Sequence, residues 1–241
     1  MAKELKFLIK LVKKASKLIK DDFEVKSKDD KGDLVTNLDY AIEKFMIERM
    51  KKTYPDFEIV SEEFNTSAAL SKNCFVIDPI DGTINFAHHF PFWGIQVACV
   101  KDGETVAAVI YLPKLRELFY ADESGAFLNG KKISVSDLAP ERCVYTGDWK
   151  RNLEFVDGNG KILTHTRGTG SMCVNYAFVA CGRLGCAVFR KSNPWDYVPG
   201  MYIAKQAGAA TYDSKNMHIA ANTKEFLKIV KDNFKKDNAK K

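Results

Sequence analysis

The sequence predicts a mixed α/β protein of layered sheets and helices, and three observations predict it. Apolar residues recur at helical spacing over residues 5–19, with lysines between them. The middle of the chain, residues 94–135, has the pattern of successive strands joined by Asp-Gly and Asn-Gly turns, which are strong signals of β-hairpins. From Cys143 onward, strand and helix patterns alternate.

The expected elements follow from this periodicity. Helices are expected at residues 5–19, from Asp39 to about Lys52, 171–182, 195–208 and around 226–234. Strands are expected at residues 57–60, 74–77, 94–100, 105–111, 117–121, 126–135, 143–147 and 186–190. The strands of the middle section would form a large antiparallel sheet, and residues 26–33 form a charged loop without periodicity.

Length and composition limit the class of protein. A chain of 241 residues can bury a sizeable core as one large domain or as two tightly joined halves, which we expect to be 1–140 and 141–241. With 46% hydrophobic and 28% charged residues, the composition is that of a soluble globular protein. No stretch has the roughly 18 unbroken apolar residues of a membrane span, and the first residues lack the apolar core of a secretory signal. We therefore expect a cytoplasmic protein that makes no use of a membrane.

Cysteines and charge exclude further classes. The six cysteines lie mostly in apolar runs and form no CxxC pair, so we expect buried, reduced thiols and neither a disulfide framework nor a zinc site. The net charge is +6, but the lysines concentrate at residues 3–20 and 224–241 on amphipathic helices. A solvated helical face is the commoner explanation of such runs, and no nucleic-acid motif accompanies them. Nucleic acid is not an expected partner.

Residues 73–86 are the stretch around which the chain is organised. Residues 74–77 are wholly apolar, as in a strand that is buried on both faces. Pro79 cannot donate to a sheet ladder, so the strand is expected to stop there. Asp-Gly at positions 81–82 predicts a tight turn, and Thr83 is a suitable N-cap for the segment that follows.

Asp78 and Asp81 lie three residues apart in this stretch and can point at one spot at the end of the strand. Removing water from an uncompensated charge is costly, so carboxylates beside a core need a partner. Mg²⁺ is a suitable partner, because it prefers oxygen ligands and takes one or two carboxylates together with substrate phosphate. Taken alone, Asp-Pro-Ile-Asp-Gly is equally typical of an ordinary surface turn.

The whole string is more specific than the turn inside it. Asp-Pro-Ile-Asp-Gly-Thr-Ile-Asn-Phe, from residue 78, resembles the D-P-[ILV]-D-G-T-x-N-[FY] signature of the inositol monophosphatase family of Mg²⁺-dependent, lithium-sensitive phosphatases. Three further segments resemble that family in the same order, V-T-x-x-D at 35–39, [IV]-x-G-E-E at 59–63 and W-D-x-A-A-G…E-A-G-G at 195–209. The resemblance covers most of the chain and implies an alternating α-β-α-β-α sandwich of the inositol monophosphatase and fructose-1,6-bisphosphatase type, with a large antiparallel sheet and a smaller, mixed C-terminal sheet.

The resemblance also implies a role for each motif residue. Two or three Mg²⁺ ions would be held by the carboxylates of Glu62, Asp78, Asp81 and Asp196 and by the carbonyl oxygen of Ile80. Glu62 and Thr83 would orient the attacking water, with Asp39 hydrogen-bonded to Thr83. Asp81 and the backbone N–H groups of Gly82 and Thr83 would bind the phosphate.

General chemistry favours the same arrangement. A phosphate dianion repels anionic nucleophiles, and two cations roughly 4 Å apart can clamp both the attacking and the leaving oxygen. Each residue alone also has a structural interpretation. Asp196 is a suitable charge for a helix N-terminus, Glu62 and Glu63 suit a solvated loop, and Thr36 with Asp39 suits a helix cap. Together, the four segments favour the metal site.

The sequence departs from the family where the substrate would bind. Inositol-hydrolysing members have a glutamate seven residues before the W-D aspartate, whereas this chain has Phe189, followed by Arg190 and Lys191. We therefore expect a bisphosphate, a sugar phosphate or a nucleotide phosphate to be preferred over inositol monophosphate. By spacing, Gly170 and Ser171 would contact the substrate with Arg190. Ser61 also replaces a glycine beside a metal ligand, while Pro199, Gln206 and Ala209 are departures within or just after the helix at 195–208.

The resemblance leaves alternatives open. The specificity could be that of a fructose-1,6-bisphosphatase or of a 3′,5′-bisphosphate nucleotidase instead of an inositol monophosphatase. A regulatory binding protein on the same fold is the alternative that is not an enzyme. Complete retention of the acidic set favours the enzyme, and the family's habit implies a homodimer.

Overall fold

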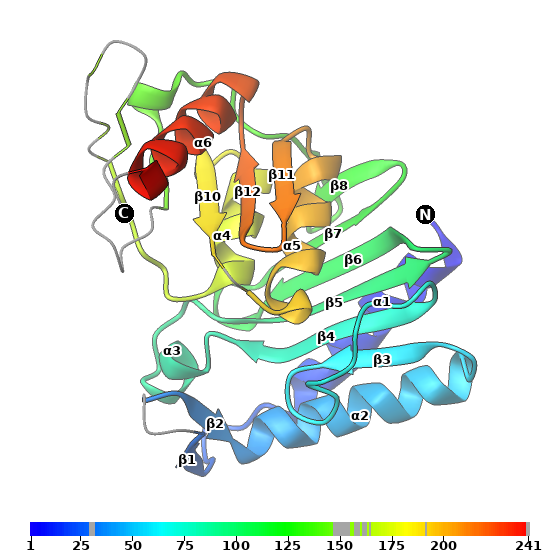
Figure 1. Ribbon diagram of the computed structural model, residues 1–241. Helices are drawn as coiled ribbons and strands as arrows, with labels where there is room; N and C mark the ends of the chain where they lie inside the picture. Colours follow the sequence, from blue (N-terminus) through cyan, green and yellow to red (C-terminus); the bar gives the residue numbers. More distant parts are fainter. Residues whose placement is uncertain are drawn as a thin grey trace.

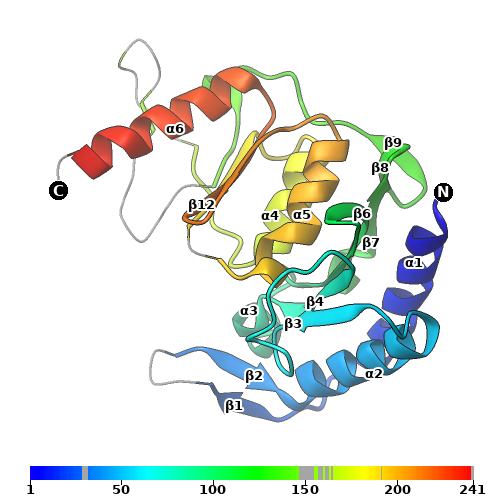
Figure 2. The same cartoon turned by 45° about the vertical axis from the view of Figure 1, so that its right-hand side comes forward.

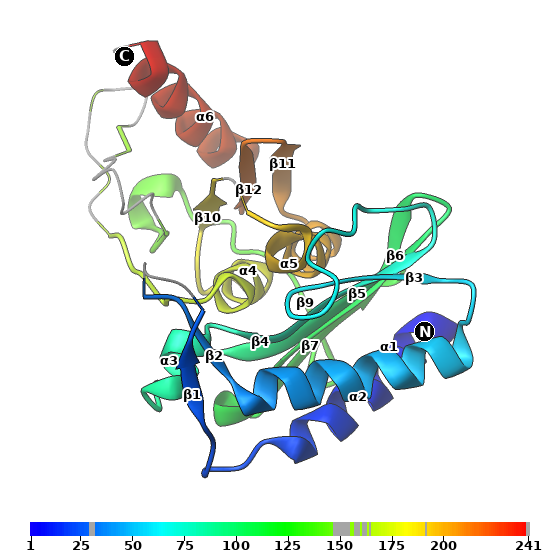
Figure 3. The same cartoon turned by 60° about the horizontal axis from the view of Figure 1, so that its bottom comes forward.

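The computed structural model describes residues 1–28, 32–146, 155–156, 160, 163, 165–190 and 192–239. Helices and sheets alternate in five layers, as Figures 1 and 3 show. Helices α1 and α2 form the first layer, a seven-stranded sheet the second, α4 and α5 the third, a three-stranded sheet the fourth and α6 the fifth. Buried apolar clusters lie between these layers, so the predicted α-β-α-β-α sandwich is confirmed.

The large sheet has the strand order β3-β4-β5-β6-β7-β8-β9. Its strands are Glu58–Ser61, Cys74–Asp81, Gly94–Lys101, Glu104–Leu112, Glu117–Asp122, Gly125–Leu128 and Lys131–Ile133. β3 and β4 are parallel and the other neighbours are antiparallel, so the predicted antiparallel sheet has one parallel pair at its edge. The two predicted hairpin turns are confirmed, because Asp102-Gly103 and Asn129-Gly130 have the positive φ angles that such turns require.

One face of this sheet is covered by α1 (Lys3–Ala15), which ends in the 3₁₀ turn η1 (Ser16–Leu18), and by α2 (Asn37–Thr53). Leu5 and Leu8 of α1 and Ile42 and Met46 of α2 are fully buried against the sheet, and full burial of such side chains stabilises by about 1.5–3 kcal/mol each. Part of the segment expected to be a charged loop forms a hairpin of β1 (Val25–Ser27) and β2 (Leu34–Thr36), which lies beside the short helix α3 (Thr83–Ala87) (Figure 3). None of the described helices is long and apolar enough to cross a membrane.

The opposite face packs against α4 (Met172–Ala180) and α5 (Pro194–Gln206). Beyond these helices lie β10 (Cys186–Phe189), β12 (Met217–Ala221) and β11 (Ala210–Ser214) (Figure 1). Helix α6 (Lys224–Ala239) lies on the other side of β12 from α4 and α5, as Figure 2 shows. These three strands are antiparallel, and an isolated parallel bridge from Tyr145 to Cys186 adds the expected mixed character. In the predicted strand at 143–147, Tyr145 forms isolated bridges, and Gly147 lies outside the described residues. Two further 3₁₀ turns are η2 (Pro113–Leu115) and η3 (Pro140–Arg142).

Candidate active site

A bulge in β4 brings two carboxylates to one face of the large sheet. The sequence predicted that this strand would stop at Pro79. That prediction is wrong, because β4 continues to Asp81. Asp78 faces Gln96 of β5 and Asp81 faces Gly94, so three steps along β4 match two along β5. Residues three apart in a regular strand point to opposite faces, and the extra residue reverses that parity. Pro79 is tolerated because a residue within a bulge needs no ladder hydrogen bond.

The chain leaves the bulge through Gly82, whose φ is 90°. A Cβ atom at this position would lie 3.0 Å from the Cβ of Ser171 and 3.1 Å from the carbonyl oxygen of Phe92, so both conformation and space require glycine. Gly82 is the N-cap of α3, and Thr83 is its first helical residue and not the cap that we expected. The backbone of Gly82 and Thr83 therefore opens a helix directly beside Asp81.

Asp81 is bound by the beginning of α4. Its Oδ2 accepts hydrogen bonds from Ser171 Oγ (3.1 Å) and from the N–H of Cys173, and its Oδ1 accepts one from the N–H of Met172 (3.2 Å). Burial raises the pKa of Asp81, and these donors oppose that rise. Ser171, predicted as a substrate contact, is the N-cap of α4 and accepts from the N–H of Val174.

Asp78 has no comparable set of donors. Its side chain is buried, and its Oδ1 has no hydrogen-bond partner among the described residues. Burial raises the pKa of Asp78 well above its usual range, and the negative charges of Glu62, Asp81 and Asp196 raise it further. A buried carboxylate among three others is costly unless a proton or a cation compensates the charge.

Asp196 is supplied by the first turn of α5. Asp196 Oδ2 accepts a hydrogen bond from the N–H of Asn193 (2.9 Å), which makes Asp196 part of a capping box. Burial, followed by the charge of Asp81, raises the pKa of Asp196 to about 8. Asp196 therefore both caps the N-terminus of α5 and belongs to the acidic cluster, so the two interpretations from the sequence hold together.

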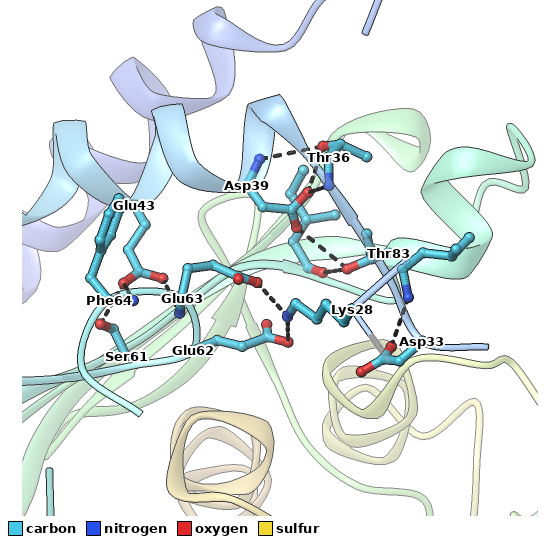
Figure 4. A network of polar contacts seen from close by, with 12 residues as sticks. Lys28, Asp33, Thr36, Asp39, Glu43, Ser61, Glu62, Glu63, Phe64 and Thr83 are labelled. Carbon is cyan, nitrogen blue, oxygen red and sulfur yellow. Dashed lines mark hydrogen bonds and ion pairs between the residues drawn. The ribbon is translucent and has the colours of Figure 1, made fainter. Parts of the chain in front are cut away.

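Lys28 lies among the acids and was not foreseen from the sequence. Its Nζ donates to Glu62 Oε1 (2.7 Å) and to Glu63 Oε1 (2.5 Å), as Figure 4 shows. Burial disfavours the charged ammonium, but Glu62 and Glu63 outweigh that effect and raise the pKa of Lys28. Burial also raises the pKa of Glu63 to about 7, against the opposing effect of Lys28. The Glu62 carboxylate thus already contacts a cationic group.

Asp39 joins the first turn of α2 to Thr83. Asp39 Oδ2 accepts from the N–H of Thr36 (2.7 Å) and from Thr36 Oγ1 (2.5 Å), so Thr36 and Asp39 form a capping box. Thr83 Oγ1 lies 3.4 Å from Asp39 Oδ1 and 2.9 Å from the carbonyl oxygen of Ile80 (Figure 4). Burial raises the pKa of Asp39 to about 6. The cap and the expected contact with Thr83 are therefore present together.

Two further polar residues support the cluster and were also missed. Gln96, fully buried, donates from Nε2 to Asp81 Oδ2 (3.5 Å) and to the carbonyl oxygen of Asp196 (3.4 Å). Glu43, also fully buried, accepts three hydrogen bonds from the segment that contains Glu62. The available signals were a glutamine inside an apolar strand and an acid one helical turn after Asp39.

The other residues predicted to contact the substrate pack against neighbouring parts of the chain. Gly170 has a φ of 76°, and a Cβ there would lie 2.9 Å from the amide of Asn85, which donates to the carbonyl oxygen of Thr169. The guanidinium carbon of Arg190 lies 4.2 Å from the ring centre of Phe234. Phe189 ends β10 with its ring 5.3 Å from Tyr176, and no acid stands at its position. Lys191 lies outside the described residues.

The donor set fits a hard divalent cation. Carboxylates and a backbone carbonyl are oxygen ligands, and Asp78 supplies a buried oxygen without a hydrogen-bond donor. Within the described part of the chain, no three acidic, histidine or cysteine side chains form a ready ligand group. As the structure stands, Lys28 contacts Glu62, and α4 binds Asp81.

Comparisons with known proteins agree with this site. The model of the inositol monophosphatase family matches residues 1–232. A fructose-1,6-bisphosphatase/inositol-1-monophosphatase of Thermotoga maritima is 36% identical over 233 residues, covering 92% of this chain and 90% of the relative. Nus factor SuhB of Escherichia coli is 30% identical over 230 residues, covering 89% and 86%. The solved structure of Thermotoga maritima IMPase has a TM-score of 0.84 at 32% identity, covering 98% of this chain and 99% of that one.

The fold, the acidic centre and these relatives first define a class of protein, the enzymes that hydrolyse phosphate monoesters. Within that class the chain belongs to the inositol monophosphatase family, since the family model spans nearly its whole length. The resemblance seen in four sequence motifs is thereby confirmed.

Proposed function

We propose that this protein is a Mg²⁺-dependent phosphomonoesterase that acts on small phosphorylated metabolites. The observation that supports it best is Asp78, a buried carboxylate with one oxygen lacking a donor, beside the charges of Glu62, Asp81 and Asp196. Bound Mg²⁺ would neutralise the phosphate and lower the pKa of a water molecule, which no side chain here does alone. Two or three ions would be held by Glu62, Asp78, the carbonyl oxygen of Ile80, Asp81 and Asp196.

The residues around these ligands would act on water and substrate. Glu62 and Thr83 would orient the attacking water and Glu62 would accept its proton, with Asp39 hydrogen-bonded to Thr83. Asp81 and the N–H groups of Gly82 and Thr83 would bind the phosphate. Lys28, which contacts Glu62, would give way to the cation.

For the substrate, we propose a second anionic group. Phe189 stands where inositol-hydrolysing members have an acid, and Arg190 follows it. The Thermotoga maritima relative is named for both fructose 1,6-bisphosphate and inositol 1-phosphate hydrolysis, which agrees with a site that accepts a bisphosphate. Arg190, with Gly170 and Ser171, would line the side of the leaving group.

A substrate panel tests both parts of the proposal. Phosphate release is measured with Mg²⁺ and with EDTA on inositol 1-phosphate, fructose 1,6-bisphosphate and adenosine 3′,5′-bisphosphate. We expect a strict metal requirement and a higher kcat/KM for one of the bisphosphates. A clear preference for the inositol ester would overturn the substrate proposal, and metal-independent release would overturn the mechanism.

A second candidate is a regulatory binding function, which is favoured by the 30% identity to a protein named as a Nus factor. Asp81→Asn separates the two functions, because catalysis needs the acidic set and a binding surface does not. We also propose a homodimer in the cytoplasm. The dimer is checked by sedimentation equilibrium of the full chain.

A further inference from the structure

Glu43 lies outside every sequence motif, yet it anchors the segment that contains Glu62. It belongs to α2 and is fully buried. Its Oε1 accepts hydrogen bonds from Ser61 Oγ (2.5 Å) and from the N–H of Phe64 (2.9 Å), and its Oε2 accepts one from the N–H of Glu63 (2.9 Å) (Figure 4). The Glu43 carboxylate thus accepts three hydrogen bonds from the turn that follows β3.

These three bonds fix the backbone on both sides of Glu62. β3 ends at Ser61, and the chain then turns, so the N–H groups of Glu63 and Phe64 have no strand partner. Glu43 supplies the acceptor that these two N–H groups would otherwise lack within the turn. Glu62 lies between Ser61 and Glu63, both of which are attached to the same rigid helix.

Ser61 is a feature of this chain, because the family pattern has glycine at its position. The side chain is fully buried, and its hydroxyl donates to Glu43 while it accepts from Asn65 Nδ2 (3.1 Å). Burial raises the pKa of Glu43, and the three donors oppose that rise by stabilising the ionised form. The serine therefore adds a donor to the anchor that a glycine cannot provide.

The same face of α2 also reaches Thr83. Asp39 and Glu43 are one helical turn apart and both fully buried. Asp39 lies 3.4 Å from Thr83 Oγ1, while Glu43 binds the segment around Glu62. One helix thereby sets the separation between Glu62 and Thr83, the two residues that would orient the attacking water in the proposed function.

We infer that Glu43, together with the Ser61 hydroxyl, is a positioning residue that fixes Glu62 and so sets the affinity for the divalent cation. The inference rests on the proposed function, because it assigns Glu62 to the cation. It adds Glu43, which lies outside the motifs, and a serine at a position where the motif has glycine.

The main test compares Glu43→Gln with Glu48→Gln, an exposed acid on the same helix. Mg²⁺ affinity is measured by calorimetry without substrate, and amide exchange of Glu63 and Phe64 is measured in EDTA. Groups that orient a metal ligand typically change metal affinity by 10–100-fold, so we expect about tenfold weaker binding in Glu43→Gln. Faster exchange at the two amides should accompany it, whereas Glu48→Gln should match the wild type.

Ser61 provides a milder pair that keeps the test valid if Glu43→Gln does not fold, which circular dichroism would show. Ser61→Ala removes one hydrogen bond, so we expect about fivefold weaker Mg²⁺ binding. Ser61→Gly should weaken it further, because glycine adds backbone freedom beside Glu62.

The outcomes separate this inference from the proposed function. Wild-type Mg²⁺ affinity in folded Glu43→Gln and Ser61→Ala overturns the inference, even if the melting temperature falls, because a merely structural role predicts that result. A wild type that neither binds Mg²⁺ nor releases phosphate overturns the proposed function and the affinity claim with it. In that case amide exchange still decides whether Glu43 holds the Glu62 segment.

Discussion

Two groups of buried carboxylates lie near Glu62, one on α2 and one at the end of β4, and their surroundings differ. On α2, Asp39 and Glu43 accept hydrogen bonds from backbone N–H groups and from the hydroxyls of Thr36 and Ser61. At the end of β4, Asp78 is buried, its Oδ1 has no donor within the described part of the chain, and it lies near other negative charges. Both groups are shielded from water, but among the described residues Asp78 Oδ1 has no donor, whereas Asp39, Glu43 and Asp81 each accept several hydrogen bonds.

The difference separates carboxylates that stabilise the fold through hydrogen bonds from a carboxylate that needs a bound cation or proton. A buried carboxylate that accepts several hydrogen bonds remains ionised at small cost and fixes what it touches. A buried carboxylate without donors costs several kcal/mol until a cation or a proton arrives. The α2 acids are therefore structural anchors, and Asp78 is the acid that needs a cation or a proton, in agreement with the proposed metal site.

The largest expected effect concerns Asp78. Asp78→Asn should lower kcat/KM by at least about a thousandfold, because a metal supplies several kcal/mol of transition-state stabilisation. The metal-free variant should also melt at a higher temperature than the wild type, since the amide removes a repelling charge. Phosphate release and calorimetric melting in EDTA check the two halves.

Asp137→Asn is the matched control, because Asp137 is exposed and far from the cluster in sequence. It should leave both kcat/KM and the melting temperature unchanged. An Asp78→Asn variant that loses activity but also melts lower without metal would contradict the comparison, because Asp78 would then be stabilising by itself.

A smaller effect concerns the pH dependence of stability. Burial and the charge of Asp81 raise the pKa of Asp196 to about 8 in the folded protein, against about 3.9 when unfolded. The folded state then binds the proton more tightly, so this stabilisation is complete below about pH 4 and is lost as the pH rises through 8. By linkage, the metal-free protein should lose roughly 2–4 kcal/mol relative to Asp196→Asn between pH 5 and pH 8.

Melting of wild type and Asp196→Asn in EDTA, at intervals between pH 5 and pH 8, measures this difference. Added Mg²⁺ should reduce the loss in the wild type, because the cation replaces the proton. A difference between the two proteins that stays constant with pH would show that the charge of Asp196 is already compensated in the metal-free protein.

Much of this contrast was accessible from the sequence, and the reason is local. Residues 74–77 are uniformly apolar because β4 is buried on both faces, and the motif after it contains the two acids that the bulge brings to one face. The hairpin turns were predictable because Asp-Gly and Asn-Gly readily adopt positive φ. Each of these signals lies within a few neighbouring residues.

On the anchoring side, the Thr36–Asp39 cap and the contact of Asp39 with Thr83 were predicted, but the role of Glu43 was not, because it depends on contacts between distant segments. Glu43 has the sequence context of any surface acid on a helix, and only the end of β3 gives it partners. Lys28 lay in a segment without periodicity, and its position between Glu62 and Glu63 follows from the β1–β2 hairpin. The bulge at Pro79 was missed because it is defined by the register of β5 and not by β4 itself. The division into 1–140 and 141–241 stays a prediction, since α4 and α5 share an apolar cluster with the large sheet.

The smallest expected effect weakens the anchoring side. Thr36→Ala removes the hydroxyl that caps α2 and donates to Asp39, and loss of such a cap costs about 1 kcal/mol of unfolding free energy. Thr36→Ser keeps the hydroxyl and should retain most of that stability. Urea unfolding of both variants measures the difference, and kcat should fall far less in either than in Asp78→Asn. Equal losses of unfolding free energy in the serine and alanine variants would show that Thr36 acts through packing of its methyl group. That result would contradict the interpretation of Asp39 as an anchor stabilised by the Thr36 hydroxyl.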